Sequence, residues 1–159
     1  MRLIVRRVRN IIIAALIIAI DIKFASVAIE AGCGIEPCCR SCETLNVTRI
    51  IDGDTLVSDR DRVRLCGVDT PERGQRCADD ATDRLKGLAG SKVRVESGPR
   101  STDRYGRLLY YVHGIDGDSI DARLILEGLA RAWTEDGQHR DLLVSLEEKT
   151  RGAGRGCLW

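Results

Sequence analysis

Three short motifs contain the residues of this chain whose side chains are suited to catalysis or ligand binding. The first is Asp-Gly-Asp-Thr at 52–55. The second is Val-Asp-Thr-Pro-Glu at 68–72, preceded by Arg64, and the third is Asp-Arg-Tyr-Gly-Arg at 103–107. Their carboxylates can share a hard cation, and their guanidinium groups can hold a phosphate. Together they supply what metal-assisted cleavage of a phosphodiester requires.

The acidic residues predict a site for an oxygen-preferring cation. Asp54 follows a tight turn and Asp69 ends a predicted strand, so their carboxylates converge if those strands pair. Thr70 precedes a proline, which keeps its backbone extended and makes its carbonyl a candidate third ligand. No His or Cys lies within these motifs, which argues against zinc or iron there.

The arginines and one further acid predict the remaining parts of the site. Arg64 and Arg107 lie on predicted strands, and a planar guanidinium matches two phosphate oxygens. Such groups stabilise the charge that develops on a phosphate under attack. Glu72 is the candidate that holds or deprotonates a water. Each motif also has a purely structural interpretation, because Asp-Gly is a common hairpin turn and strand arginines usually face solvent.

Hydrophobic periodicity predicts the elements that position these motifs. Strands are expected at 45–51, 55–58, 63–69, 92–97 and 107–113, and helices at 78–88, 120–128 and 139–152. This order predicts an α+β domain. Five short strands are compatible with a barrel of the OB type, together with three α-helices, although periodicity does not choose a barrel over an open sheet.

Length and charge limit the possibilities further. The 159 residues are enough for one domain with a real core, but not for two. The first 28 residues hold five of the 25 basic side chains and one of the 24 acidic ones, which leaves 20 basic and 23 acidic residues in the remainder. Binding of an anion must therefore depend on locally placed arginines rather than on a basic surface.

Residues 1–28 are predicted to be a signal peptide or a membrane anchor. Four arginines precede the apolar run 11–20, and small residues at 26–28 offer a cleavage site after Ala28. The prediction is an exported protein, periplasmic or secreted. If the segment is not cleaved, residues 11–29 remain as an anchor and provide the only membrane association; a cytosolic protein is the third alternative.

Seven cysteines agree with export. Four of them fall within 29–43, which is predicted to be a Cys-rich linker ahead of a folded domain at 44–159. Cysteines in an oxidising compartment tend to pair, but the Cys33–Cys42 cluster also has spacing that could bind zinc. Cys66 could pair with Cys77 or be buried as a small apolar side chain, and Cys157 is expected to attach the C-terminus to the domain.

Five motifs occur in order along residues 45–159 of this chain. They are Ile-Asp-Gly-Asp-Thr-Leu at 51–56, Val-Arg-Leu at 63–65, Gly-Val-Asp-Thr-Pro-Glu at 67–72, Asp-Arg-Tyr-Gly-Arg at 103–107 and Gly-Leu-Ala at 128–130. In these motifs the chain resembles the staphylococcal nuclease, or thermonuclease-like, family. The resemblance implies an OB-fold barrel with three helices. It also implies a calcium-dependent phosphodiesterase that acts on DNA and RNA and leaves a 5′-hydroxyl and a 3′-phosphate.

The same resemblance implies a role for each site residue. Asp54 and Asp69 would ligate Ca²⁺ with the carbonyl of Thr70, and Asp52 would support them through water. Glu72 would position or activate the attacking water. The remaining residues would hold phosphate: Arg64 and Arg107 the scissile one, Arg104 and Tyr105 a terminal one.

The chain departs from the family pattern near the substrate. The segment after Glu72 is shorter, Arg104 replaces a lysine, and the aromatic residues that stack on a base after the Gly-Leu-Ala motif are not matched. Trp133 either provides that stacking or belongs to the core. We expect a monomer that prefers single-stranded nucleic acid. The alternative functions are a catalytically inactive OB-fold module that binds nucleic acid or protein, and a structural protein built on its cysteines.

Overall fold

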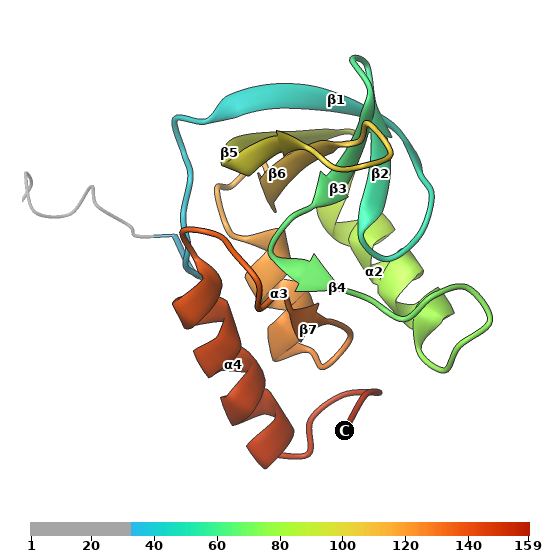
Figure 1. The fold of residues 1–159 in the computed structure, drawn as a ribbon, viewed down its shortest axis with the longest axis vertical. Helices are drawn as coiled ribbons and strands as arrows, with labels where there is room; N and C mark the ends of the chain where they lie inside the picture. The colour runs from blue at the N-terminus through green and yellow to red at the C-terminus, as the bar shows by residue number, and fades with distance from the viewer. Residues whose placement is uncertain (1–32) are drawn as a thin grey trace, which may run out of the picture. The chain divides into compact units, whose positions relative to one another are not determined.

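The computed structural model describes residues 33–159, and the predicted signal peptide or anchor lies outside them. Figure 1 shows a barrel of strands with helices to one side of it. The elements in order are β1 (Glu43–Ile50), β2 (Thr55–Ser58), β3 (Arg62–Leu65), β4 (Val68–Asp69), α2 (Ala78–Ala89), β5 (Lys92–Thr102), β6 (Leu108–His113), α3 (Ile120–Leu126), β7 (Arg131–Ala132) and α4 (Arg140–Gly152). No helix among these residues is long and apolar enough to cross a membrane.

Five strands close into a barrel in the order β1-β2-β3-β6-β5, with β5 returning to pair with β1. The pairs are antiparallel except for β3 with β6. Leu56, Val63 and Val93 face the interior and are fully buried, as alternation along the strands requires. The prediction of an α+β fold with a five-stranded OB barrel and three helices is confirmed.

The helices cover one part of the barrel. α3 packs against β6, α2 and α4, so it lies at the centre of the helical layer (Figure 1). Ser119 caps α3 by accepting a hydrogen bond from the amide of Ala122 at 3.1 Å. Leu85, Leu124 and Leu143 bring one buried leucine from each helix into the shared core. This core fixes the barrel face that carries the three motifs.

Two predicted strands differ from those in the structure. The third was expected to run to Asp69, but β3 ends at Leu65, and Val68–Asp69 form a separate strand, β4, that pairs with β7, which was not predicted. The fourth was expected to end at Gly98-Pro99, but β5 continues to Thr102. The register with β6 shifts between Ser97 and Thr102, so Pro99 lies where the ladder is irregular and its missing N–H costs nothing.

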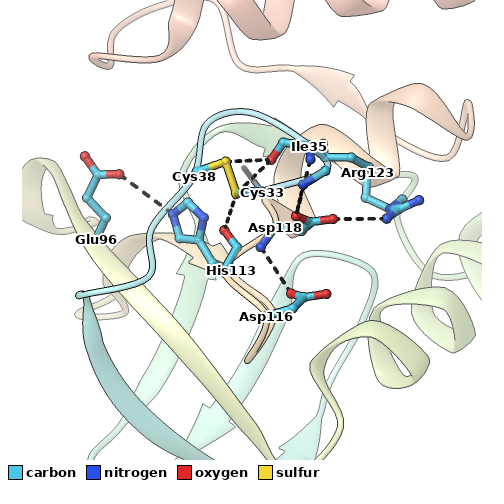
Figure 2. Close-up of a disulfide and its surroundings, with 10 residues drawn as sticks. Cys33, Ile35, Cys38, Glu96, His113, Asp116, Asp118 and Arg123 are labelled. Carbon is cyan, nitrogen blue, oxygen red and sulfur yellow. Dashed lines mark hydrogen bonds and ion pairs between the residues drawn. A yellow bond between two sulfur atoms is a disulfide. The ribbon is translucent and has the colours of Figure 1, made fainter. Parts of the chain in front are cut away.

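Disulfides and hydrogen bonds to the loop before α3 hold the Cys33–Cys42 segment in place. Its cysteines form the disulfides Cys33–Cys38 and Cys39–Cys42. Figure 2 shows the first of these beside the loop before α3. Asp118 accepts a hydrogen bond from the amide of Gly34 at 2.7 Å, and Ile35 accepts one from the amide of Ser119 at 3.2 Å.

A third disulfide corrects the predicted pairing near the site. Cys77 at the start of α2 is bonded to Cys157, which confirms the attachment of the C-terminus, while Cys66 is unpaired. Of the two alternatives for Cys66, the bond to Cys77 is therefore wrong, and Cys66 packs partly buried against the core. Cys66 is held against β6 by a hydrogen bond from its amide to the Tyr110 carbonyl at 2.9 Å, and Gly98 lies close to its sulfur.

Candidate active site

A cleft of about 540 Å³ contains all nine of the predicted site residues. They are Asp52, Asp54, Arg64, Asp69, Thr70, Glu72, Arg104, Tyr105 and Arg107. They come from the turn between β1 and β2, from β3, from β4 and the loop after it, and from the turn between β5 and β6. The barrel therefore brings together motifs that are about 50 residues apart in sequence.

Asp54 lies deepest among the acidic residues of the cleft. The turn before it can approach Thr70 closely because Gly53 has no side chain; a Cβ there would lie 2.8 Å from the Thr70 hydroxyl. Asp54 accepts hydrogen bonds at Oδ2 from the amide and hydroxyl of Thr70 (3.2 and 3.0 Å) and at Oδ1 from Thr55 (3.0 Å). Burial raises the pKa of Asp54 to about 6, with Asp52 adding to the increase and Arg64 opposing it.

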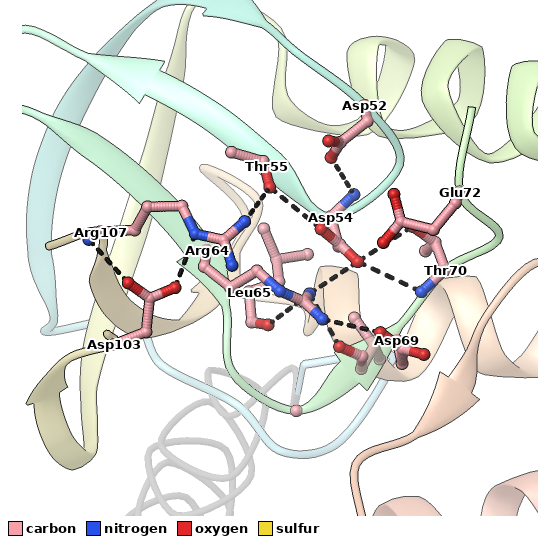
Figure 3. A network of polar contacts seen from close by, with 12 residues as sticks. Asp52, Asp54, Thr55, Arg64, Leu65, Asp69, Thr70, Glu72, Asp103 and Arg107 are labelled. Atoms are coloured by element: carbon pink, nitrogen blue, oxygen red, sulfur yellow. Dashed lines mark hydrogen bonds and ion pairs between the residues drawn. The ribbon is translucent and has the colours of Figure 1, made fainter. Parts of the chain in front are cut away.

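Arg64 joins the two predicted metal-binding carboxylates. Its Nη1 lies 2.7 Å from Asp54 Oδ2, and its Nη2 lies 2.9 Å from Asp69 Oδ1 (Figure 3). Nη1 also donates to the carbonyls of Leu65 and Val68 at 3.1 and 2.9 Å. The side chain is only 12% exposed, so a fork of donors is fixed in one orientation at the floor of the cleft.

Arg107 is fixed on the other side of the same floor. Its Nε donates to Asp103 Oδ2 at 2.7 Å, and its Nη1 donates to the Thr55 hydroxyl at 3.2 Å. Thr55 in turn donates to Asp54, so one hydroxyl connects the two halves of the site (Figure 3). The positioning roles of Asp103 and Thr55 were not predicted. For Asp103, the i, i+4 spacing from Arg107 was a signal in the sequence that could have indicated the role.

The other predicted residues lie around these two arginines. Asp52 accepts a hydrogen bond from the amide of Asp54 at 3.2 Å. Glu72 is exposed, and within residues 33–159 its carboxylate forms no ion pair. Tyr105 is 68% exposed, with the guanidinium of Arg104 stacked 4.7 Å from its ring centre. An exposed aromatic ring and an exposed cation therefore stand at the rim.

The far wall of the cleft holds residues that the motifs did not indicate. Trp133 lines it and is partly buried, and its indole Nε1 donates to Asp136 at 2.9 Å. Arg100 bonds the same carboxylate through two nitrogens at 2.8 and 3.3 Å. Trp133 is not part of the hydrophobic core cluster. The structure therefore favours the prediction that Trp133 stacks on a base over the prediction that it packs in the core.

The cleft offers a cation oxygen donors from side chains and from the main chain. Within residues 33–159, no three His, Cys, Asp or Glu side chains are gathered closely enough to hold a metal by themselves. Asp54 and Asp69 nevertheless both contact the guanidinium of Arg64, and the backbone amide of Thr70 donates a hydrogen bond to Asp54. These donors are all oxygen, so they fit a hard cation that completes its shell with water and main-chain carbonyls.

The fold and the cleft define a small barrel protein with a carboxylate and arginine site, and sequence comparisons agree. The family model described as "Staphylococcal nuclease homologue" matches residues 62–159. The thermonuclease of Staphylococcus hyicus is 37% identical over 137 residues, covering 77% of this chain and 78% of its own. That of Staphylococcus intermedius is 40% identical over 124 residues, covering 69% and 72%. An uncharacterized endonuclease of Escherichia coli is 37% identical over 119 residues, covering 71% and 74%. This chain belongs to the staphylococcal nuclease homologue family.

Proposed function

We propose that this protein is a calcium-dependent nuclease that hydrolyses phosphodiester bonds of DNA and RNA and leaves 3′-phosphate ends. The observation that carries the proposal is the joint placement of two carboxylates and two arginines in one cleft. Arg64 and Arg107 both lie within hydrogen-bond distance of the network around Asp54. Relatives named thermonuclease and endonuclease support the same class of reaction.

The cation would be held by the carboxylates of Asp54 and Asp69 and the carbonyl of Thr70, with Asp52 acting through water. When bound, it supplies positive charge that polarises a phosphoryl oxygen. Asp54 suits this role because it is already fixed by three hydrogen bonds on its two oxygens. A ligand held in place in advance loses little conformational entropy when it binds.

Arg64 and Arg107 bind the scissile phosphate from two sides and stabilise the charge that grows during attack. Each is fixed by a carboxylate, Arg64 by Asp54 and Arg107 by Asp103, so neither must be ordered at the moment of reaction. Glu72 holds the attacking water and accepts its proton. Its exposed carboxylate, without an ion-pair partner among the described residues, suits a group that must bind water.

Arg104 and Tyr105 contact a terminal phosphate at the rim, and Trp133 stacks on a base. The hydrogen bond to Asp136, which Arg100 also holds, keeps the indole ring in the wall of the cleft. A ring held in this way is a platform for an unpaired base, because a base inside a duplex has both faces covered by its neighbours and cannot stack on the indole. We therefore propose a preference for single strands.

We also propose that the protein is an exported monomer, made as a signal peptide or anchor at 1–28, a Cys-rich linker at 29–43 and a nuclease domain at 44–159. Three disulfides support export, because such bonds persist in oxidising compartments. Mass spectrometry of the protein recovered from outside the cytoplasm measures the N-terminus directly. A mature chain that begins after Ala28 supports cleavage, whereas recovery only from the cytosol contradicts export.

The proposed reaction is tested by the ends of its products. A 5′-labelled single-stranded oligonucleotide is cleaved in the presence of Ca²⁺, and the labelled fragments are treated with phosphatase. The proposal expects fragments whose mobility changes, because they carry a 3′-phosphate. Glu72→Gln should lower the single-turnover rate by about 10²-fold or more. Fragments with 3′-hydroxyl ends, or wild-type rates in Glu72→Gln, would contradict it.

A further inference from the structure

A second, shallower hollow of about 380 Å³ lies next to the cleft. Its lining consists of Arg49, Ile50, Ile51, Arg62 and Arg73, and it includes no acidic side chain. Two of its members adjoin the cleft along the chain, since Ile51 precedes Asp52 and Arg73 follows Glu72. The two hollows are therefore lined by neighbouring residues at these two points of the chain.

Strand register places the arginines of this hollow in line with those of the cleft. Val57 of β2 pairs with Arg49 of β1 on one side and with Arg62 of β3 on the other. Arg62 comes two residues before Arg64, and the intervening Val63 is buried, so both arginines leave the same outer face of β3. Residues spaced in this way lie roughly 7 Å apart along a strand. The outer surface of the barrel thus carries guanidinium groups from the cleft towards β1.

Among the described residues, the arginines that line this hollow have no acidic partner. Arg49, Arg62 and Arg73 are exposed, and within residues 33–159 none of the three forms an ion pair. Arg73 donates only to the carbonyl of Ile51, at 3.5 Å. In contrast, carboxylates hold the guanidinium groups of Arg60, Arg84 and Arg100. Three unneutralised cations at one hollow repel each other unless an anion binds there.

We propose that Arg49, Arg62 and Arg73, here called the arginine patch, bind backbone phosphates of a nucleic-acid strand beyond the bond that is cut. This proposal rests on the proposed nuclease function for the identity of the strand. The chain outside residues 1–28 carries more acidic than basic residues, so a strand gains affinity only where arginines are unpaired. The patch makes long strands better substrates than short ones, because only a long strand spans both hollows.

The test compares two variants that each lose three positive charges. The patch variant combines Arg49→Ala, Arg62→Ala and Arg73→Ala. The control combines Lys86→Ala, Lys92→Ala and Lys149→Ala, which are exposed residues of α2, β5 and α4 outside both hollows. Affinity for a fluorescent 20-nucleotide single strand is measured by anisotropy in excess chelator, so that no cleavage occurs, at several salt concentrations.

The patch variant should bind the 20-nucleotide strand about tenfold more weakly than wild type. Its plot of log affinity against log salt concentration should have a slope shallower by about 2, because each of the three lost phosphate contacts removes about 0.7 from the slope. The control should retain the wild-type slope. Equal affinities and slopes for the two variants would overturn the proposal. Wild-type protein that binds vesicles rich in phosphatidylserine but not the oligonucleotide would also overturn it.

Cleavage then separates this proposal from the proposed function. With Ca²⁺, the patch variant should raise KM for the 20-nucleotide strand and leave kcat and the cleavage of a dinucleotide unchanged. Loss of dinucleotide cleavage would place these arginines in the cleft itself and contradict the proposal. If wild type cleaves nothing yet its binding depends on the patch, the nuclease function fails while the binding site stands. Thermal melting of both variants checks that they remain folded.

Discussion

At the residue scale, Arg64 has two roles in the proposed reaction. Its two terminal nitrogens contact Asp54 and Asp69, and we propose that the same guanidinium also binds a phosphate. The main-chain carbonyls of Leu65 and Val68 hold the same group from behind. Its geometry therefore depends on a planar fork with several donors, and a single positive charge at the same place would not reproduce it.

Replacing Arg64 tests that dependence. We expect Arg64→Ala to lower kcat on single-stranded DNA by about 10²- to 10³-fold, as for loss of one preorganised donor group elsewhere. Arg64→Lys should restore little, because an ammonium cannot contact both carboxylates and two phosphate oxygens. Steady-state kinetics measure the effect, with Lys92→Ala as a surface control. Wild-type kcat in Arg64→Lys would show that charge alone is sufficient.

A second residue-scale prediction concerns Trp133. Loss of the ring in Trp133→Ala should raise KM for single-stranded DNA about tenfold, within the range for one stacked base, and change kcat little. Trp133→Phe should keep most of the affinity, because it retains an aromatic face while losing the hydrogen bond to Asp136. If both variants were equally impaired, the indole N–H rather than stacking would account for the role of Trp133.

At the element scale, sequence periodicity predicted the long elements well. All three helices lie where the spacing of leucines and alanines placed them, because each buries one apolar stripe. The two-residue strands β4 and β7 have no periodic signal of their own, and only the packed barrel brings Val68 opposite Ala132. The same holds for cysteine pairing, since Cys77 and Cys157 are 80 residues apart. A sequence alone gives no contact between them.

The Cys77–Cys157 bond should stabilise the domain by closing that long loop. Replacing both cysteines with serine should lower the free energy of unfolding by about 2–4 kcal/mol, as measured by denaturant titration. Cys66→Ala serves as the control, because it leaves all three disulfides intact and should cost about 1 kcal/mol or less. A double variant as stable as the control would mean that hydrogen bonds such as Leu158 N–H to the Gly128 carbonyl suffice to hold the C-terminus.

At the scale of the whole molecule, stability should depend on pH through the buried His113. This side chain is fully buried, and burial lowers its pKa below the usual 6.5, although Glu96 opposes the change. The unfolded chain therefore takes up a proton near pH 6.5 and the folded chain resists it, so this group reduces stability as the pH falls. Figure 2 shows Glu96 beside the imidazole ring.

His113→Leu should remove this contribution. The free energy of unfolding of wild type minus that of the variant should decrease as the pH is lowered from 7.5 to 5.5. Burial raises the pKa of Asp54 and of Asp121 to about 6, which acts in the opposite direction, but both proteins share those groups and the difference cancels them. Denaturant titrations at each pH provide the measurement. A difference that stays constant would contradict the buried-histidine explanation.

The site was predictable from sequence to the extent that its residues lie in short motifs. Asp54, Glu72 and Arg107 were identified by type and spacing, and the structure places all of them in one cleft. Residues that only position other side chains do not lie in recognisable motifs and cannot be identified by type and spacing. Thr55, whose hydroxyl connects Asp54 to Arg107, became recognisable only through its contacts. Its role depends on the pairing of β2 with β3 and of β3 with β6, which the sequence does not specify residue by residue.

The central claim is that Asp54 and Asp69 hold a cation that the reaction requires. Its most direct test is the cleavage rate of a single-stranded oligonucleotide by the wild-type protein, measured as free Ca²⁺ is increased from excess chelator to the millimolar range. We predict no cleavage in chelator, a rate that rises and saturates with Ca²⁺, and little rate at any concentration for Asp54→Asn. Full activity in chelator, or a wild-type response in Asp54→Asn, would contradict the account.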